Sequence, residues 1–174
     1  MFKTLISVIA IALLVGCASP ATQQSMSVTA QDIPTKVNAK LKGQLAVRTI
    51  GGGKETNPMW ISQVDGQGFK GALDKSLAVA GYKAVDGSAA KYSVDANLQD
   101  LDQPFMGFTF DVVSTVLYTV TGEGQQKQFP ITATGSASTS DAFIGMERMR
   151  IANERSIKEN IKQFLLKLGD QAGW

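Results

Sequence analysis

Alternating apolar and polar residues predict four strands along the chain. The alternation is strictest over residues 92–98, and it recurs over residues 108–121 and 129–137. Residues 122–124, Gly-Glu-Gly, are typical of a tight turn, so the two segments that flank them should form an antiparallel hairpin. A less regular alternation over residues 37–50 predicts a further, half-buried strand.

Apolar residues spaced three and four apart predict two helices. The first covers residues 69–80, with a capping box at residues 62–65 before it and Gly81 as the residue that ends it. The second covers residues 142–168, with Asp141 as its N-cap. This order of elements predicts an α+β two-layer sandwich, in which an antiparallel sheet of about four strands is covered on one face by two helices.

The first residues of the chain have the pattern of an export signal. Lys3 precedes an apolar run over residues 5–15, about eleven residues long, whereas a helix that crosses a bilayer needs about 20. Residues 14–17, Leu-Val-Gly-Cys, resemble the lipobox of bacterial lipoproteins. The resemblance implies cleavage between Gly16 and Cys17 and diacylation of the Cys17 sulfur. The alternatives are an ordinary secretory signal and a short uncleaved anchor.

The residue after Cys17 is Ala18 rather than Asp, which in lipoproteins of this type marks retention in the inner membrane. The resemblance therefore implies an outer-membrane protein that is lipid-anchored and faces the periplasm. Residues 18–31 are small and polar and predict a flexible tether. The expected organisation is a cleaved signal peptide over residues 1–16, a lipidated cysteine and tether over residues 17–36, and one domain over residues 37–174.

Composition narrows the chemistry that the chain can perform. It contains no histidine, the commonest general base and metal ligand, and its single cysteine is assigned to the lipid, so an internal disulfide is excluded. The chain has 17 Lys and Arg against 15 Asp and Glu, and removing Lys3 with the signal leaves a net charge of +1. This balance does not suggest nucleic acid as a partner. No cofactor is expected.

The candidate catalytic groups are four acidic residues around the second and third strands: Asp95, Asp100, Asp102 and Asp111. Paired carboxylates can serve in acid–base or metal chemistry. However, the alternation places Asp95 and Asp111 on solvated strand faces, and Asp100 and Asp102 flank a turn before Pro104. The sequence therefore favours a protein that is not an enzyme.

Several patterns together resemble the YajG-type small lipoproteins of Gram-negative bacteria. They are the lipobox, residues 69–77 (Phe-Lys-Gly-Ala-Leu-Asp-Lys-Ser-Leu) with residues 80–82 (Ala-Gly-Tyr), the strand over residues 92–98, the long hairpin and the closing helix. The resemblance covers most of the chain after Cys17. It implies an outer-membrane lipoprotein with a periplasmic binding-type domain, and it transfers no catalytic residue.

Two surfaces are candidates for binding. The first is a turn between strands that holds three bulky apolar residues: Phe105, Met106 and Phe108. Exposed, they would form a contact surface for a protein or lipid partner; folded inward, they would cap the core. The second is a basic face of the last helix, which would meet lipid phosphates or an acidic partner unless its cations are ordinary solvated charges. It consists of Arg148, Arg155 and Lys158.

Two functions follow from these features. The first is a non-catalytic interaction and assembly module, attached to membrane lipid through acylated Cys17, with an envelope protein as partner. Its contact surface would be a sheet edge or the turn at Phe105. The second is a lipid or glycolipid carrier with a cavity between sheet and helices. Its lining would be Phe69, Leu77, Val112, Tyr118 and Phe164. A packed core at these five residues would remove the basis for a carrier.

Overall fold

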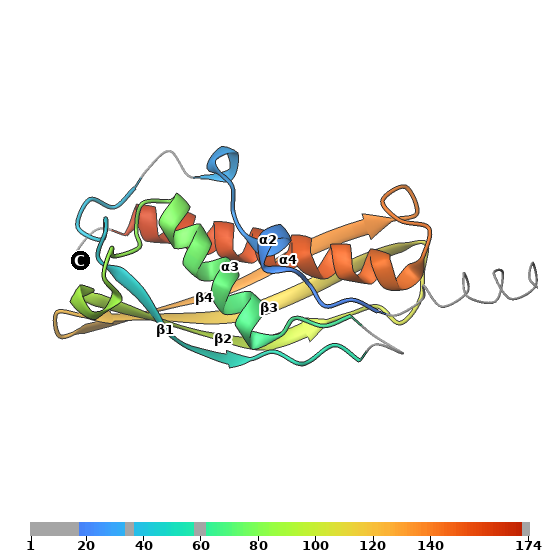
Figure 1. Cartoon of the computed structure of the whole chain (residues 1–174), viewed down its shortest axis with the longest axis horizontal. Coiled ribbons are helices and arrows are strands. Elements are labelled where there is room, and N and C mark those ends of the chain that lie inside the picture. Colours follow the sequence, from blue (N-terminus) through green and yellow to red (C-terminus); the bar gives the residue numbers. More distant parts are fainter. Residues whose placement is uncertain (1–17, 34–36, 58–61, 172–174) are drawn as a thin grey trace, which may run out of the picture.

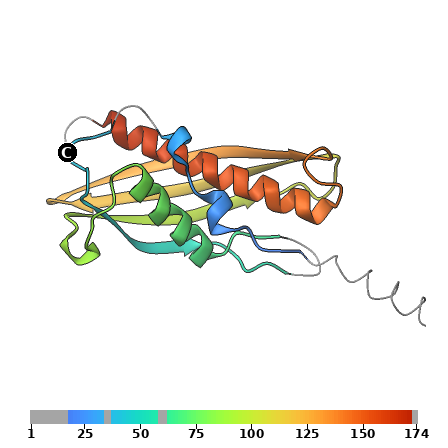
Figure 2. The same cartoon turned by 45° about the horizontal axis from the view of Figure 1, so that its top comes forward.

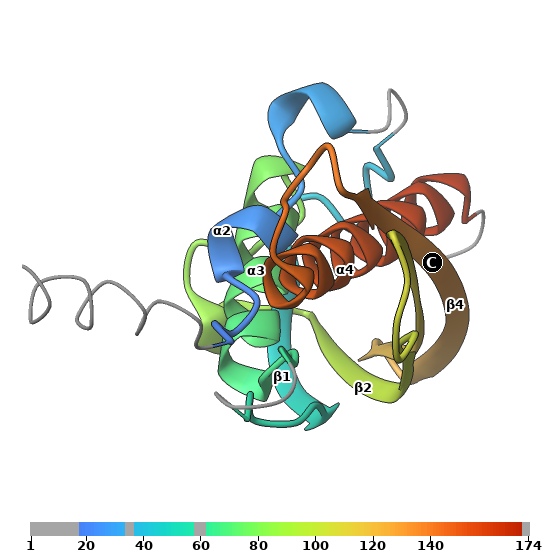
Figure 3. The ribbon, with the colours of Figure 1, turned by 90° about the vertical axis from the view of Figure 1, so that its right-hand side faces the viewer.

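The computed structural model describes residues 18–33, 37–57 and 62–171. Its helices and strands are α2 (Gln23–Met26), β1 (Leu45–Gly52), α3 (Gly66–Val79), β2 (Tyr92–Asp102), β3 (Thr109–Gly122), β4 (Gln125–Ser138) and α4 (Gly145–Asp170), with short 3-10 turns η2 (Ala30–Asp32) and η3 (Gly87–Ala89). The helices lie on one face of the sheet, which curves around α4 (Figure 1 and Figure 3). Within the described ranges, no helix combines the length and the hydropathy that crossing a bilayer requires.

The four strands form one sheet in the order β1-β2-β3-β4, and their pairing is mixed. The pairs β2–β3 and β3–β4 are antiparallel, but β1 runs parallel to β2. The prediction of an antiparallel sheet is therefore wrong at this edge. The reason is that α3 connects β1 to β2 as a crossover, which returns the chain to the end of the sheet where β1 began.

The β3–β4 hairpin confirms the predicted turn. Gly122 pairs with Gln125, and the two residues between them, Glu123 and Gly124, have φ values of 50° and 73°. Two consecutive positive φ values are the mark of a type I′ turn, whose twist matches that of paired strands.

The capping of the two long helices differs in part from the prediction. The N-cap of α3 is Asp65, whereas Ser62 is buried. Gly81 has a φ of 76°, as expected of the residue that ends a helix. The last helix begins at Gly145 rather than at residue 142, and Asp141 does not cap it. The turn before α4 is therefore longer than the sequence predicted.

Residues 18–33 belong to the folded domain and do not form the flexible tether that their composition predicted. They include α2, a third helix where two were expected, and Ala21, Met26 and Val28 are buried in the core. The Thr22 backbone N–H and hydroxyl both donate to Glu154 of α4, at 2.8 and 3.0 Å. The difference has a tertiary cause: α2 contacts both α3 and α4 (Figure 2), and Met26 of α2 is buried in the same core as Phe69 of α3 and Ile157 of α4.

An ion pair fixes the end of this segment on α4. Lys158 Nζ lies 2.8 Å from Asp32 Oδ2, and that carboxylate also accepts hydrogen bonds from the backbone N–H and hydroxyl of Thr29. The bond to Lys158 is the main cause that lowers the pKa of Asp32 well below its usual value, and the bonds to Thr29 add to it.

We expect residues 29–33 to detach from α4 in acid. Because the pKa of Asp32 is lower in the folded than in the unfolded chain, its contribution to stability is complete above about pH 4 and is lost as the pH falls toward the folded-state pKa. Amide NMR shifts of this segment should report the change during acid titration. Asp32→Asn should abolish this pH dependence and loosen the segment at neutral pH; shifts that titrate alike in both proteins would contradict the assignment.

A buried polar network fixes α4 on the sheet. Asn160 Nδ2 donates to the carbonyl oxygens of Ser114 and Ile131, at 3.1 and 3.2 Å, and Asn160 Oδ1 accepts from the Tyr118 hydroxyl at 2.9 Å. Ser156 Oγ donates to Ser114 Oγ at 2.8 Å. Since buried polar groups are costly unless they are hydrogen-bonded, this network specifies one position of the helix along β3 and β4.

Candidate functional site

Two neighbouring turns expose large apolar side chains. In the turn after β2, the exposed fractions of Phe105, Met106 and Phe108 are 94%, 75% and 83%. In the turn before α4, those of Phe143 and Ile144 are 92% and 53%. We name these five residues the apolar tip. For the first turn, the structure thus favours the exposed alternative over inward folding. An apolar patch of this kind on a folded domain typically marks a contact surface.

One guanidinium group joins the two turns of the apolar tip. Arg148 Nη1 donates to the carbonyl oxygens of Ala142 and Phe143, at 3.2 and 2.9 Å, and Nη2 donates to Gly107 O at 3.1 Å. Its guanidinium carbon lies 5.1 Å from the centre of the Phe110 ring. Only 8% of Arg148 is exposed, and it forms no ion pair with any described carboxylate. Arg148 therefore acts as a buried cross-link between the turns.

An open groove of about 610 Å³ lies between the two turns. Its lining includes Phe105, Met106, Phe110, Met146 and Met149. Phe110 and Met149 belong to a small core cluster beneath the turns. The apolar tip is thus continuous with an apolar groove, and methionine side chains can adapt to a ligand or partner of irregular shape.

Replacing Arg148 by Met should loosen both turns of the apolar tip without unfolding the domain. Met retains an apolar stem but donates no hydrogen bond to the three carbonyl oxygens, at a cost of about 1–3 kcal/mol. Amide hydrogen exchange over residues 105–109 and 142–146 should accelerate about tenfold or more. Lys158→Met, on the same helix, should leave these turns unchanged. Equal exchange in wild type and Arg148→Met would refute the cross-link.

The structure does not bring the three predicted basic residues together as one open surface. Arg148 is buried behind the apolar tip. Arg155 pairs with Asp141 at 2.7 Å, and this bond is the main cause that lowers the pKa of Asp141 to about 2. Lys158 is paired with Asp32. Each of the three cations is thus hydrogen-bonded or ion-paired within the domain, so these residues do not form a face of unpaired positive charges.

Two of the four acidic candidates are engaged on the open face of the sheet. Asp95 accepts hydrogen bonds from Arg48 Nε and Thr49 Oγ1, and Asp111 accepts one from Ser136. Arg48 is the main cause that lowers the pKa of Asp95. A carboxylate held ionised by an arginine is poorly suited to proton transfer near neutral pH.

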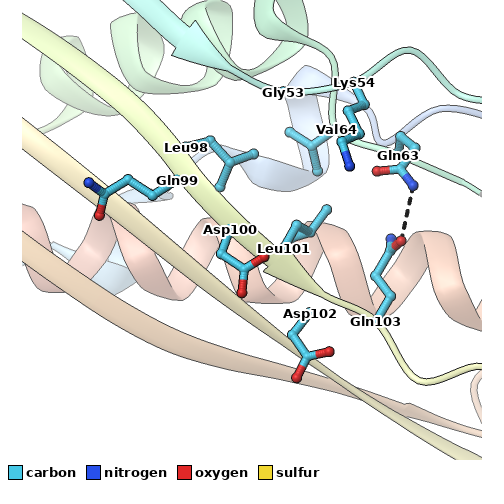
Figure 4. A pocket seen from close by; sticks show the side chains of 10 residues that line it. All are labelled: Gly53, Lys54, Gln63, Val64, Leu98, Gln99, Asp100, Leu101, Asp102 and Gln103. Carbon is cyan, nitrogen blue, oxygen red and sulfur yellow. Dashed lines mark hydrogen bonds between the residues drawn. The ribbon is translucent and has the colours of Figure 1, made fainter.

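The other two acidic candidates line a polar pocket of about 410 Å³ beside β2 (Figure 4). The Gln63 and Gln103 side chains are hydrogen-bonded at its edge, at 3.1 Å. The carboxylates of Asp100 and Asp102 point away from the Lys54 ammonium group across the pocket. Over the residues that the structure describes, no group of three or more acidic or cysteine side chains could hold a metal ion.

The cavity that a carrier would need is filled by side chains. All five residues predicted to line it are buried: Phe69, Leu77, Val112, Tyr118 and Phe164. The rings of Tyr118 and Phe164 stack with their centres 4.0 Å apart. None of the five lines a pocket described above. The packed core removes the observation on which the carrier hypothesis depended.

The contact surface predicted from the sequence lacks two of the five residues of the apolar tip. The predicted last helix, residues 142–168, includes Phe143 and Ile144, although the uncharged stretch Ala142-Phe143-Ile144-Gly145 resembles the composition of the turn at residues 104–108. That likeness was the available signal. The remaining predicted site residues, Gly16 and Cys17, lie outside the described residues, so lipidation stays a prediction.

Comparison with known proteins gives no family assignment. Neither a protein-family model nor a curated protein matches the chain. Among solved structures, a hypothetical protein of Chlamydia trachomatis is 10% identical, with 73% of this chain and 93% of that one covered and a TM-score of 0.47.

A Xanthomonas campestris protein described with the DUF330 family model is also 10% identical, covering 77% of this chain and 92% of that one, with a TM-score of 0.45. An uncharacterised protein is 12% identical over 76% of this chain and 86% of that one, with a TM-score of 0.48. At TM-scores below 0.5, these similarities say nothing about what this chain binds or does.

Proposed function

We propose that this chain is a non-catalytic, lipid-anchored interaction module of the bacterial envelope. Acylated Cys17 holds it in the outer membrane, the folded domain faces the periplasm, and the apolar tip is its contact surface. The resemblance to YajG-type lipoproteins belongs to this proposal, as does the interpretation of residues 1–16 as a cleaved signal peptide.

The observation that carries the proposal is the exposure of five large apolar side chains on two adjacent turns. Removing such a side chain from water is favourable by about 1.5–3 kcal/mol. Contact with a partner that covers these exposed side chains would therefore be stabilised by their burial. Arg148 holds the turns in this arrangement rather than letting them fold inward. Of the four acidic candidates, by contrast, Asp95 is ion-paired with Arg48 and Asp111 is hydrogen-bonded to Ser136, and the pocket beside Asp100 and Asp102 is polar.

The anchor is tested by producing the full chain in a Gram-negative host. Mass spectrometry should find a polypeptide that begins at Cys17 and carries acyl chains, and fractionation should place it in the outer membrane. Cys17→Ser should be neither acylated nor retained there. Unprocessed full-length chain with a free Cys17 thiol in the cytosol would refute the anchor.

The contact surface is tested by photo-crosslinking in the same cells. A photoreactive side chain at position 105 should form crosslinks to lipid or to an envelope protein. The same group at Val85, which is fully exposed, is the matched control and should give none. Equal yields from both positions would show that the apolar tip is not the contact surface.

A further inference from the structure

The chain enters the domain close to the apolar tip. Ala18, the first described residue, is buried. The Ser62 hydroxyl donates to Ser19 O at 2.7 Å, and Ala21 N donates to Gln63 O at 3.1 Å. The segment that follows Cys17 is therefore fixed to the domain from its beginning.

The residues that fix this segment also hold the turn after β2. Gln103 Nε2 donates to Ser62 O at 2.9 Å and to Asn153 Oδ1 at 2.7 Å, and Gln63 Nε2 donates to Gln103 Oε1 at 3.1 Å. Gln103 directly precedes the turn that carries Phe105. The start of the domain and the apolar tip therefore lie at the same end of the elongated molecule, opposite the end at which α4 terminates (Figure 1 and Figure 2).

This arrangement would keep a lipid attached to Cys17 close to the surface of the domain. Cys17 immediately precedes Ala18, and neighbouring Cα atoms are about 3.8 Å apart. The flexible tether predicted over residues 17–36 would have allowed any orientation at the membrane. With residues 18–33 packed on α3 and α4, acyl chains on Cys17 would bring the bilayer against this end.

We propose that the apolar tip inserts into the bilayer that holds the protein's own lipid anchor, so that the end of the domain carrying the tip faces the membrane. This inference rests on the proposed acylation of Cys17. Residues 103–108 and 142–146 contain no ionisable side chain, so neither turn brings a charge into the lipid. Aromatic and methionine side chains on such turns suit the boundary between headgroups and acyl chains.

The occupant is lipid rather than a protein because the anchor fixes which surface the tip meets. A protein partner would have to enter between the tip and the bilayer. The groove beside the tip, lined by Met146 and Met149, would then receive acyl chains or the tip's own side chains. Both turns would act together, since Arg148 joins them.

Depth-dependent fluorescence quenching tests this orientation on the acylated protein in vesicles of phosphatidylethanolamine and phosphatidylglycerol. Met106→Cys and Val85→Cys each carry one thiol-reactive fluorophore, because acylation blocks the Cys17 sulfur. The two positions lie beyond opposite ends of β2, whose eleven residues span about 35 Å. Quenching by spin-labelled lipid should be several-fold stronger at position 106, with a blue-shifted emission.

A second variant separates insertion from mere proximity. Replacing Phe105, Phe108 and Phe143 together by Ser should abolish the blue shift at position 106, while circular dichroism stays unchanged because all three side chains are exposed. Equal quenching at both positions in acylated protein would overturn the inference and leave the proposed anchor intact. A blue shift that appears only in native outer-membrane preparations would assign the tip to a protein partner instead. An unmodified Cys17, visible by mass spectrometry, would overturn both.

Discussion

Gly135→Ala should prevent α4 from packing on the sheet and should be among the most damaging single substitutions in the domain. A Cβ atom at Gly135 would overlap the backbone nitrogen of Ser156 and the backbone oxygen of Ala152, both in α4. Because these are backbone atoms of a regular helix, no side-chain rotation relieves the overlap. Overpacking of a core costs about 1–3 kcal/mol or more, and here we expect at least the upper value.

Thermal unfolding followed by circular dichroism should show a Tm about 10 °C or more below wild type. Gly66→Ala is the matched control, since its new Cβ would meet no atom nearer than 3.9 Å at the first position of α3. That variant should keep the wild-type Tm or raise it slightly. A wild-type Tm for Gly135→Ala would show that α4 does not lie against β4 as described.

Phe164→Ala should lower the free energy of unfolding by about 3–5 kcal/mol. The Phe164 ring is fully buried, stacks on Tyr118 with centres 4.0 Å apart, and meets the edge of Phe129 at 5.7 Å. The Tyr118 hydroxyl is held by Asn160, so this ring cannot move to fill the space. The loss therefore combines the transfer of apolar surface with a cavity that does not collapse.

Urea unfolding measures this loss as a lower midpoint with an unchanged slope. Leu166→Ala provides the comparison, because Leu166 lies on the same helix two residues further but is exposed. It should cost less than about 1 kcal/mol. Similar values for the two variants would mean that the space between sheet and helices is not the packed core found here.

Local sequence patterns predicted the structure correctly where the conformation of a segment depends only on residues close to it in sequence. The alternating residues 92–98 lie within β2, as predicted. Glu123 and Gly124 form the predicted hairpin turn, because the backbone conformation of such a turn depends on neighbouring residues alone. The exposed turn at Phe105 was likewise recognised as a candidate contact surface from its composition. Its exposure, however, depended on Arg148, whose partners lie in two separate turns.

The sequence by itself determined the α+β class, the central antiparallel strands, the long last helix and the pattern of a lipid-anchor signal. The tertiary structure alone decided that β1 pairs parallel to β2, that α2 replaces a tether, and that Phe143 and Ile144 join the apolar tip. The physical reason is the distance along the chain over which the interactions act. Periodicity indicates which face of a helix or strand is buried, but it does not indicate which distant segment packs against that face. The bond between Thr22 and Glu154 spans 132 residues, and only the packed fold brings its two atoms together.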